Sequence, residues 1–112
     1  MPISFQNRTI TQVAIDQGGA GSTDLVAAPG AGLKIYVVTI VVSLAAAGTV
    51  RFTEGTGPTN LTGDVDLAVA GGYVTIGDGI NPVLQTNTAG DKLSIVSTGG
   101  AANGWIRYFV AA

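Results

Sequence analysis

Four carboxylates are the side chains of this sequence whose type and spacing could support acid–base chemistry. Asp64 and Asp66 are two residues apart, so a strand would place both on one face. Turns could bring Glu54 and Asp78 towards that pair. Paired carboxylates hydrolyse glycosidic bonds, one as acid and the other as base or nucleophile. Alternate charged residues on a strand are usually its solvated face, so we expect that role here and no catalytic residue in the chain.

Two loop segments carry part of a ligand-binding motif. Residues 78–81, Asp-Gly-Ile-Asn, supply oxygen atoms that could hold calcium but lack the alternating acids of a calcium-binding loop. Residues 18–21 are rich in glycine but lack the lysine and the following helix of a phosphate-binding loop. We therefore expect neither a metal nor a cofactor, and we predict a flexible joint at residues 17–21.

The residue types that are missing exclude most other chemistries. There is no cysteine and no histidine, which removes disulfides, thiolate nucleophiles, Cys/His zinc sites and Ser–His catalysis. The net charge is −2 with no basic run, so a nucleic-acid partner is not expected. The apolar stretch 35–50 has sixteen residues, fewer than the roughly 20 of a spanning helix. It predicts a strand and no membrane partner, and the N-terminus shows no charged leader of a secretory signal.

The elements that position these residues are predicted to be strands of a single domain. The 112 residues are 46% hydrophobic but only 11% charged, less than half the usual ~25%, and such a surface suggests a partner. Gly, Asn, Asp and Pro clusters separate short runs rich in Val, Ile and Thr, a pattern typical of an all-β sandwich or barrel. The sequence predicts about eight strands, at residues 9–15, 24–28, 33–44, 48–54, 64–70, 73–76, 92–98 and 105–110.

The longest strand is apolar on both faces, which suggests that both are covered. One face is predicted to be core, and the other to be covered by a second sheet or another subunit. The predicted core face carries Tyr36, Val38, Ile40, Val42 and Leu44, and the second face carries Ile35, Val37, Thr39, Val41 and Ser43.

The last strand offers a candidate contact surface. Ile106, Tyr108 and Val110 are predicted to face inward, which leaves an outward stripe in which Arg107 can lie over an aromatic ring. A local cation–π pair on an ordinary surface is the alternative. Trp, Phe and Arg are enriched at interfaces, and we favour contact. The candidate interface residues are Trp105, Arg107, Phe109, Val37, Val41, Ile3 and Phe5.

The N-terminal segment can be interpreted in two ways. Residues 1–17 form either an arm that pairs with a sheet edge elsewhere or an ordinary first strand, and residues 18–112 form the β-sandwich domain. Apolar residues such as Ile3 and Phe5 suit either role.

Two antiparallel registers are also predicted. Val50 should lie opposite Leu67 and Phe52 opposite Val65, with Arg51 opposite Asp66 on the outer face. Across the loop with Gly99 and Gly100, the register should place Leu93 opposite Tyr108 and Ile95 opposite Ile106.

A series of short motifs runs from Leu33 to Tyr108. It comprises residues 43–52 (SLAAAGTVRF), 61–68 (LTGDVDLA), 71–74 (GGYV), 88–95 (TAGDKLSI) and 104–108 (GWIRY). This series resembles small jelly-roll-like structural proteins of tailed bacteriophages that decorate capsid heads or form the bases of head spikes. The resemblance implies a jelly-roll-like, single-domain antiparallel β-sandwich and transfers no functional residue.

The same resemblance implies a non-enzymatic virion protein. It would be made in the host cytoplasm and would sit on the capsid exterior as a homotrimer. Its partner would be the major capsid protein, and it would stabilise the assembled head. The alternative is a glycan- or receptor-binding module at the tip of a fibre or head spike.

Overall fold

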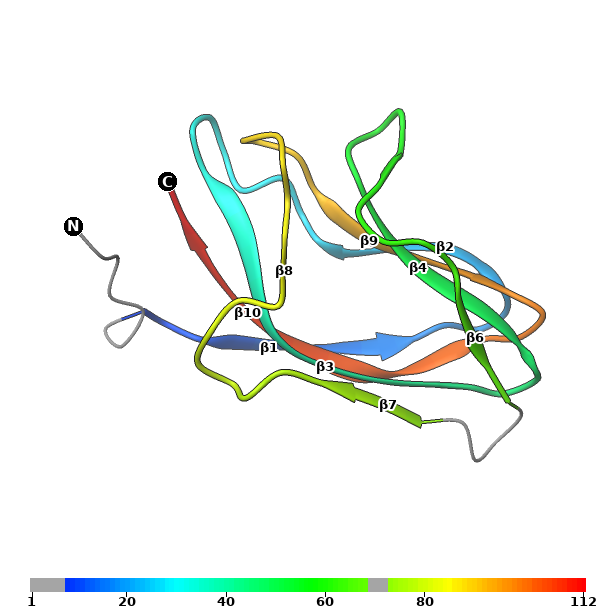
Figure 1. Ribbon diagram of the computed structural model, residues 1–112. Helices are drawn as coiled ribbons and strands as arrows, with labels where there is room; N and C mark the ends of the chain where they lie inside the picture. Colours follow the sequence, from blue (N-terminus) through cyan, green and yellow to red (C-terminus); the bar gives the residue numbers. More distant parts are fainter. Residues whose placement is uncertain (1–7, 69–72) are drawn as a thin grey trace.

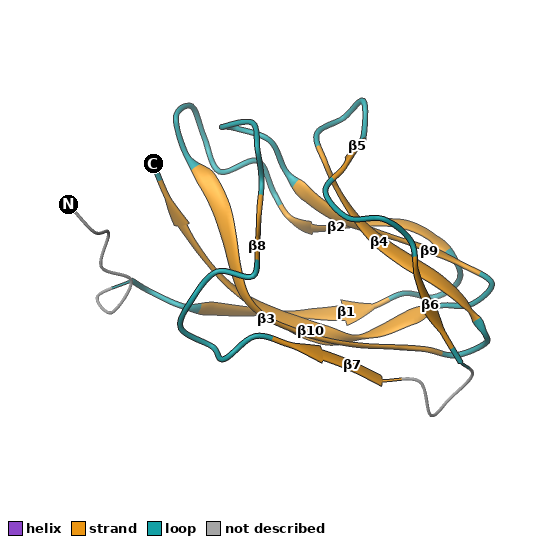
Figure 2. Cartoon of the chain, viewed as in Figure 1, coloured by secondary structure: helices purple, strands orange, loops and turns teal. Residues whose placement is uncertain are grey.

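Ten β-strands and no helix are formed by residues 8–68 and 73–112, the part of the chain that the computed structural model describes (Figure 2). That part contains no helix able to cross a membrane. The strands are β1 (Thr11–Asp16), β2 (Gly21–Val26), β3 (Lys34–Leu44), β4 (Gly48–Glu54), β5 (Thr59–Asn60), β6 (Val65–Leu67), β7 (Tyr73–Ile76), β8 (Leu84–Gln85), β9 (Leu93–Thr98) and β10 (Ala102–Ala111).

The strands form two antiparallel sheets that pack face to face (Figure 1). The first sheet has the order β1-β10-β3-β7, and β8 also pairs with β3. The second has the order β2-β9-β4, and both β5 and β6 pair with β4. The pairs β1/β10, β2/β9, β3/β7 and β4/β6 are nested in the sequence and alternate between sheets, which is the jelly-roll arrangement. The predicted all-β antiparallel sandwich is confirmed.

All eight predicted strands occur, and β4 and β7 have the predicted bounds. Of these eight, β6 is the shortest and keeps three residues of the predicted 64–70. Residues 69 and 70 of that range lie outside the described residues. The two-residue strands β5 and β8 were not predicted, because two residues carry no periodic signal.

Inward-facing side chains from both sheets form one core between the layers. Phe52 on β4 and Ile106 on β10 are buried in it as predicted, and Tyr108 packs against it. Val110, also predicted to face inward, lies near the end of β10 and is exposed. The core comprises Ile15, Leu25, Val26, Ile35, Val37, Ile40, Val42, Leu44, Val50, Phe52, Leu67, Leu93, Ile95, Ala102 and Ile106.

A β-bulge in β3 changes which side chains face the core. β10 pairs with β3 in one register up to Arg107 and in another from Tyr108 onward, which leaves Val38 without a partner on β10. An extra residue in one strand reverses the alternation of its side chains and bends the strand. Figure 1 shows β3 bending along its length.

The bulge makes part of the predicted face assignment of β3 wrong. Ile35 and Val37, predicted for the second face, belong to the core, and Tyr36, predicted for the core, pairs with the outward-facing Phe109. Beyond the bulge the prediction is confirmed. Ile40, Val42 and Leu44 face inward, and Thr39, Val41 and Ser43 pair with β10 on the outer side.

The pairing of β4 with β6 is confirmed, but its predicted register is wrong by two residues. Val50 lies opposite Val65 and Thr49 lies opposite Asp66. A shift of two residues keeps every side chain on its predicted face, so Val50 still faces the core. Arg51 forms its ion pair with Asp64 rather than with Asp66.

The predicted pairing of β9 with β10 is wrong, because the two strands belong to opposite sheets. Ile95 and Ile106 nevertheless both belong to the core between the two layers. The connection that carries Gly99 crosses between the sheets beside the connection from β3 to β4. A Cβ on Gly99 would lie 2.4 Å from the Ala47 carbonyl oxygen, and the φ of Gly99 is +84°, so only glycine fits there.

The predicted flexible joint contains a buried, fully bonded side chain. Gln17 donates from Nε2 to the Gly21 carbonyl oxygen at 2.9 Å and to Thr23 Oγ1 at 3.1 Å. Its Oε1 accepts hydrogen bonds from the Ser97 hydroxyl at 2.5 Å and from the Ala102 N–H at 2.8 Å. Gln17 therefore connects the two sheets, and a loose joint at this residue is wrong.

Residues 11–16, within the predicted arm, form β1 and pair with β10 of the same chain. This stretch follows the first-strand interpretation. The division into residues 1–17 and 18–112 otherwise stays a prediction, and Ile3 and Phe5 lie outside the described residues.

We expect Gln17→Ala to lower the free energy of unfolding by about 1–3 kcal/mol for a buried group left without a partner, here the Ala102 N–H. The Ser97 hydroxyl loses its acceptor but keeps the hydrogen bond from the Gly21 N–H. Urea unfolding at a fixed protein concentration measures the change. Ser22→Ala, on the exposed side of β2, is the control and should stay within about 0.5 kcal/mol of the wild type. Equal stability of the two variants would show that Gln17 does not hold the sheets together.

Candidate functional site

The outer face of the first sheet carries the predicted stripe of β10. Trp105 lies between Ala14 of β1 and Val41 of β3. Arg107 and Phe109 follow Trp105 at intervals of two residues along β10, so all three side chains lie on the same side of the sheet. We call this surface the aromatic face and define it by Gln12, Ala14, Tyr36, Thr39, Val41, Trp105, Arg107 and Phe109.

Arg107 and Trp105 form the predicted cation–π pair. The guanidinium carbon lies 4.8 Å from the centre of the Trp105 ring. Arg107 Nε donates to Gln12 Oε1 at 3.1 Å, which fixes the guanidinium over the ring. Its terminal nitrogens have no partner among the described residues, so they remain available to an acceptor on another molecule.

Phe109 supports the aromatic face more than it enlarges the accessible surface. Its ring stacks on Tyr36 with the centres 5.0 Å apart and the planes 11° from parallel, and only 1% of Phe109 is exposed. The Tyr36 hydroxyl donates to the Ala112 carbonyl oxygen at 3.1 Å. The guanidinium of Arg8 lies 5.9 Å from the centre of the Phe109 ring.

Two residues of β3 complete the aromatic face. Thr39 and Val41 are 7% and 8% exposed although they point away from the core. Thr39 Oγ1 is buried and has no hydrogen-bond partner in the described chain. Gly79 lies close above it, since a Cβ added to Gly79 would be 3.5 Å from this oxygen. Val37, also predicted for an interface, is in the core and offers no outer surface.

The outer face of the second sheet has the opposite chemistry, and we call it the polar face. Thr49 and Thr98 join their hydroxyls at 2.5 Å. Arg51 donates to Asn60 Oδ1 at 3.1 Å and to Asp64 Oδ1 at 3.3 Å. These polar groups bond to one another within the chain. The Thr53 hydroxyl, which follows Arg51 on the same side of β4, is buried and has no hydrogen-bond partner among the described residues.

Asp24 extends the polar face across β2 and β9. Its carboxylate accepts hydrogen bonds from the Ser94 hydroxyl at 2.8 Å and from Lys92 Nζ at 3.0 Å. These two donors lower the pKa of Asp24 because they favour its charged form.

The four carboxylates considered for catalysis do not form one site. Asp64 pairs with Arg51, Glu54 at the end of β4 binds the loop after β8, and Asp78 is bonded within its own loop. Residues 8–68 and 73–112 contain no group of three acidic side chains that could hold a metal.

Glu54 is a structural carboxylate that the sequence analysis missed. It is 2% exposed and accepts the N–H groups of Asn87 and Thr88, both at 2.8 Å. It thereby ties the loop after β8 to β4. The period of two that places Val50 and Phe52 in the core also places Glu54 there, and an inward-facing acid was the signal for this role.

Asp78 organises its own loop. Its Oδ1 accepts the N–H groups of Ile80 at 2.8 Å and Asn81 at 2.9 Å, and its Oδ2 accepts from the Asn81 side chain at 3.1 Å. The N–H groups of Asn81 and Ile80 hold the pKa of Asp78 below its usual range. The oxygens considered for calcium are thus bonded to donors of the same loop.

Comparison with known proteins gives two weak structural similarities. No protein family and no curated protein matches the sequence. A chain in the cryo-EM structure of the virus-like particle of the extra small virus of the giant freshwater prawn Macrobrachium rosenbergii has a TM-score of 0.41 and 14% identity, over 98% of this chain and 81% of that one. A chain in the structure of the infectious bursal disease virus Gx strain has a TM-score of 0.30 and 17% identity, over 97% of this chain and 30% of that one. Neither similarity assigns a family or a function to this chain.

Asp24 and Asp78 predict how stability depends on pH. Their folded-state pKa values are lowered, so their contribution is complete above about pH 4, the ordinary aspartate pKa, and is lost as the pH falls through the lowered values. We expect the melting temperature of Asp24→Asn/Asp78→Asn to fall less between about pH 5 and about pH 3 than that of the wild type. Asp66→Asn, which removes a carboxylate without a bonded partner in the described chain, is the control. Parallel curves for all three proteins would contradict the assignment.

Proposed function

We propose that this chain is a non-enzymatic structural protein of a phage virion that binds the outside of the assembled head and holds neighbouring capsid subunits together. The resemblance of residues 33–108 to head decoration proteins supports this function. The jelly-roll sandwich is compatible with it, since jelly rolls recur in capsid proteins, but the same fold also serves lectins. The choice between these functions therefore depends on the surface.

The aromatic face is the observation that carries the proposal. It combines Trp105 with Arg107, whose terminal nitrogens have no partner among the described residues. Val41 lies opposite Trp105 on β3 and is only 8% exposed, so Trp105 and Arg107 supply most of the accessible surface. Tryptophan and arginine dominate the energy of protein interfaces. On the polar face Arg51 is bonded to Asn60 and Asp64, whereas the terminal nitrogens of Arg107 on the aromatic face have no partner among the described residues. This difference between the two arginines supports a contact at the aromatic face.

The alternative function is glycan or receptor binding at a fibre or spike tip. A sugar binds by stacking on an exposed aromatic ring beside polar groups. Arg107 already lies over the ring of Trp105, and Phe109 is stacked and buried. Both observations favour a protein contact over a sugar contact.

Head decoration works by mass action. A protein that binds the assembled head, and not its separated parts, stabilises the head by about 2.7 kcal/mol per site at a hundredfold excess over Kd. Many sites add their contributions. We propose a homotrimer on the capsid exterior with the major capsid protein as partner, and no cofactor is needed for this action.

We expect Trp105→Ala and Arg107→Ala to weaken binding to mature heads of the encoding phage by about 30-fold, the loss expected from truncating a central interface residue. Co-sedimentation with heads measures binding, and native mass spectrometry measures the oligomer. Arg51→Ala is the matched control, since it removes an arginine from the middle of a strand on the polar face. Equal losses for Arg51→Ala and Arg107→Ala, or no binding to heads together with binding to a glycan array, would overturn the proposal.

We expect Asp64→Asn/Asp66→Asn to leave head stabilisation unchanged. The Arg51–Asp64 pair is partly exposed, with 31% and 54% of the side chains accessible, so its loss should cost at most about 1 kcal/mol of folding stability. Heating bare and decorated heads in parallel measures the effect. Hydrolysis of a phage-relevant glycan by the wild type, lost in the double variant, would make the protein an enzyme instead.

A further inference from the structure

On one side of the sandwich, two inward-facing rows end in exposed apolar side chains. Val65 of β6 pairs with the buried Val50, and Ile76 of β7 pairs with the buried Ile40, so both lie in inward-facing rows. Val65 and Ile76 are each 40% exposed, whereas Val50 and Ile40 are 2% and 3% exposed. The core rows therefore end at this side with accessible apolar side chains.

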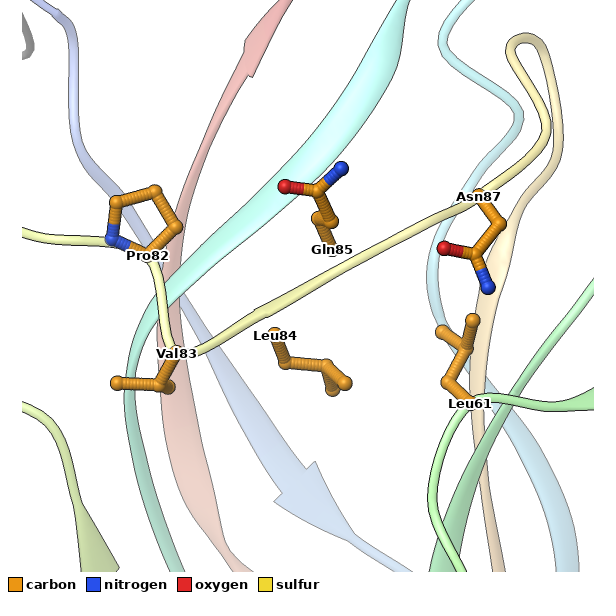
Figure 3. A pocket seen from close by; sticks show the side chains of 6 residues that line it. All are labelled: Leu61, Pro82, Val83, Leu84, Gln85 and Asn87. Atoms are coloured by element: carbon orange, nitrogen blue, oxygen red, sulfur yellow. The ribbon is translucent and has the colours of Figure 1, made fainter.

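A pocket of about 310 Å³ lies on the same flank, between β8 and the loop that follows β5. Figure 3 shows Leu84 of β8 extending towards Leu61, with Pro82 and Val83 alongside. The lining includes no charged residue. We call this flank the open side and define it by Leu61, Val65, Ile76, Pro82, Val83, Leu84, Gln85 and Asn87.

The opposite side of the sandwich is closed, so the open side is not a general consequence of the fold. There Gln17 bonds to β2, β9 and β10, and Ile15 and Leu25 are buried. Four of the six exposed large hydrophobic side chains of the described residues lie on or beside the open side: Val65, Ile76, Ile80 and Val83. Gathered apolar side chains of this kind mark interaction sites.

Short edge strands line the open side. In the described chain β7 and β8 pair only with β3, and β5 and β6 pair only with β4. Short edge strands protect against uncontrolled aggregation, but their outer backbone groups can still accept one added strand. An extended segment could pair with this backbone, and its side chains would meet both the apolar residues of the pocket and the polar Gln85 and Asn87.

We propose that the open side receives the N-terminal segment of a second copy of this chain, with Ile3 and Phe5 facing the pocket. The segment has the required chemistry. Ile3 and Phe5 alternate in sequence, so they share one face of an extended strand. Residues 1–7 carry no charged side chain, which suits the uncharged lining of the pocket. Seven extended residues span up to about 25 Å.

The order of strands indicates that the segment comes from another copy. The described chain begins beside β1, which is the edge of the first sheet opposite to β7 and β8. Three strand spacings, about 14 Å, separate these edges, and the inner face between them is filled by the core. A segment from a neighbouring copy meets no such obstacle. The inference deepens the proposed homo-oligomer by assigning it a contact and rests on that part of the proposed function.

Disulfide trapping tests this contact, because the natural chain has no cysteine. Phe5→Cys and Val83→Cys are placed on separate chains, co-expressed with different tags and oxidised mildly. A docked segment holds its thiol near the pocket at an effective concentration of about 1 mM, so the disulfide between the two chains should form about tenfold more than with Ser22→Cys on β2 as the acceptor. Ile3→Ser in the Phe5→Cys chain should reduce the yield. Urea unfolding of each variant confirms that it is folded.

Three outcomes would overturn the proposal: equal yields with Val83→Cys and Ser22→Cys, no disulfide between chains, or a disulfide only within one chain in the Phe5→Cys/Val83→Cys double variant. The last outcome would place the segment on its own subunit. The experiment uses the isolated protein without heads. If no disulfide forms between Phe5→Cys and Val83→Cys chains, the N-terminal contact is rejected. If Arg107→Ala still weakens head binding in that case, the head-binding function is retained.

Discussion

The bulge at Val38 determines which surfaces this sandwich presents. Without the extra residue, Tyr36 would point into the core, and Ile35 and Val37 would lie outside. With it, three apolar side chains of β3 beyond the bulge and two before it all face inward. The same bulge leaves the Val37 and Val38 carbonyl groups free to accept the N–H groups of Val83 at 2.8 Å and Gly79 at 3.3 Å. The loop between β7 and β8 is thereby fixed against β3, and it both covers Thr39 and supplies part of the open side.

Two buried polar side chains, Gln17 and Glu54, hold connecting segments against the sandwich by hydrogen bonds. Gln17 uses both its amide nitrogen and its amide oxygen between the sheets, and Glu54 receives two backbone N–H groups from the loop after β8. Burying such groups costs several kcal/mol when they are unpaired, but here they are paired. The hydrogen bonds of Gln17 join the two sheets, and those of Glu54 join the loop after β8 to β4. A small sandwich thus obtains closed ends from hydrogen bonds and leaves its apolar side chains for the core and the flank.

Much of the fold could be predicted because, in a strand with one buried face, every second side chain is apolar. The strand bounds of β4 and β7, the inward Phe52 and the outward Trp105 and Arg107 all follow from that period. The bulge could not be predicted, since one extra residue leaves no mark in a run that is apolar on both faces. The β9/β10 pairing failed for a related reason: both strands have inward residues in the same core, and periodicity does not distinguish pairing within a sheet from packing between sheets.

The distribution of charge connects the fold to the proposed contacts. Only 11% of the residues are charged, and on the polar face Arg51, Asp24 and Lys92 are each paired with a neighbour of the same chain. Arg107 differs, since one nitrogen is held by Gln12 and the others are not engaged in the described chain. Pre-orienting an arginine over a tryptophan reduces the entropy lost when a partner binds. The aromatic face is therefore organised before contact. The residues that define the open side are different ones, so the two proposed contacts use separate parts of the surface.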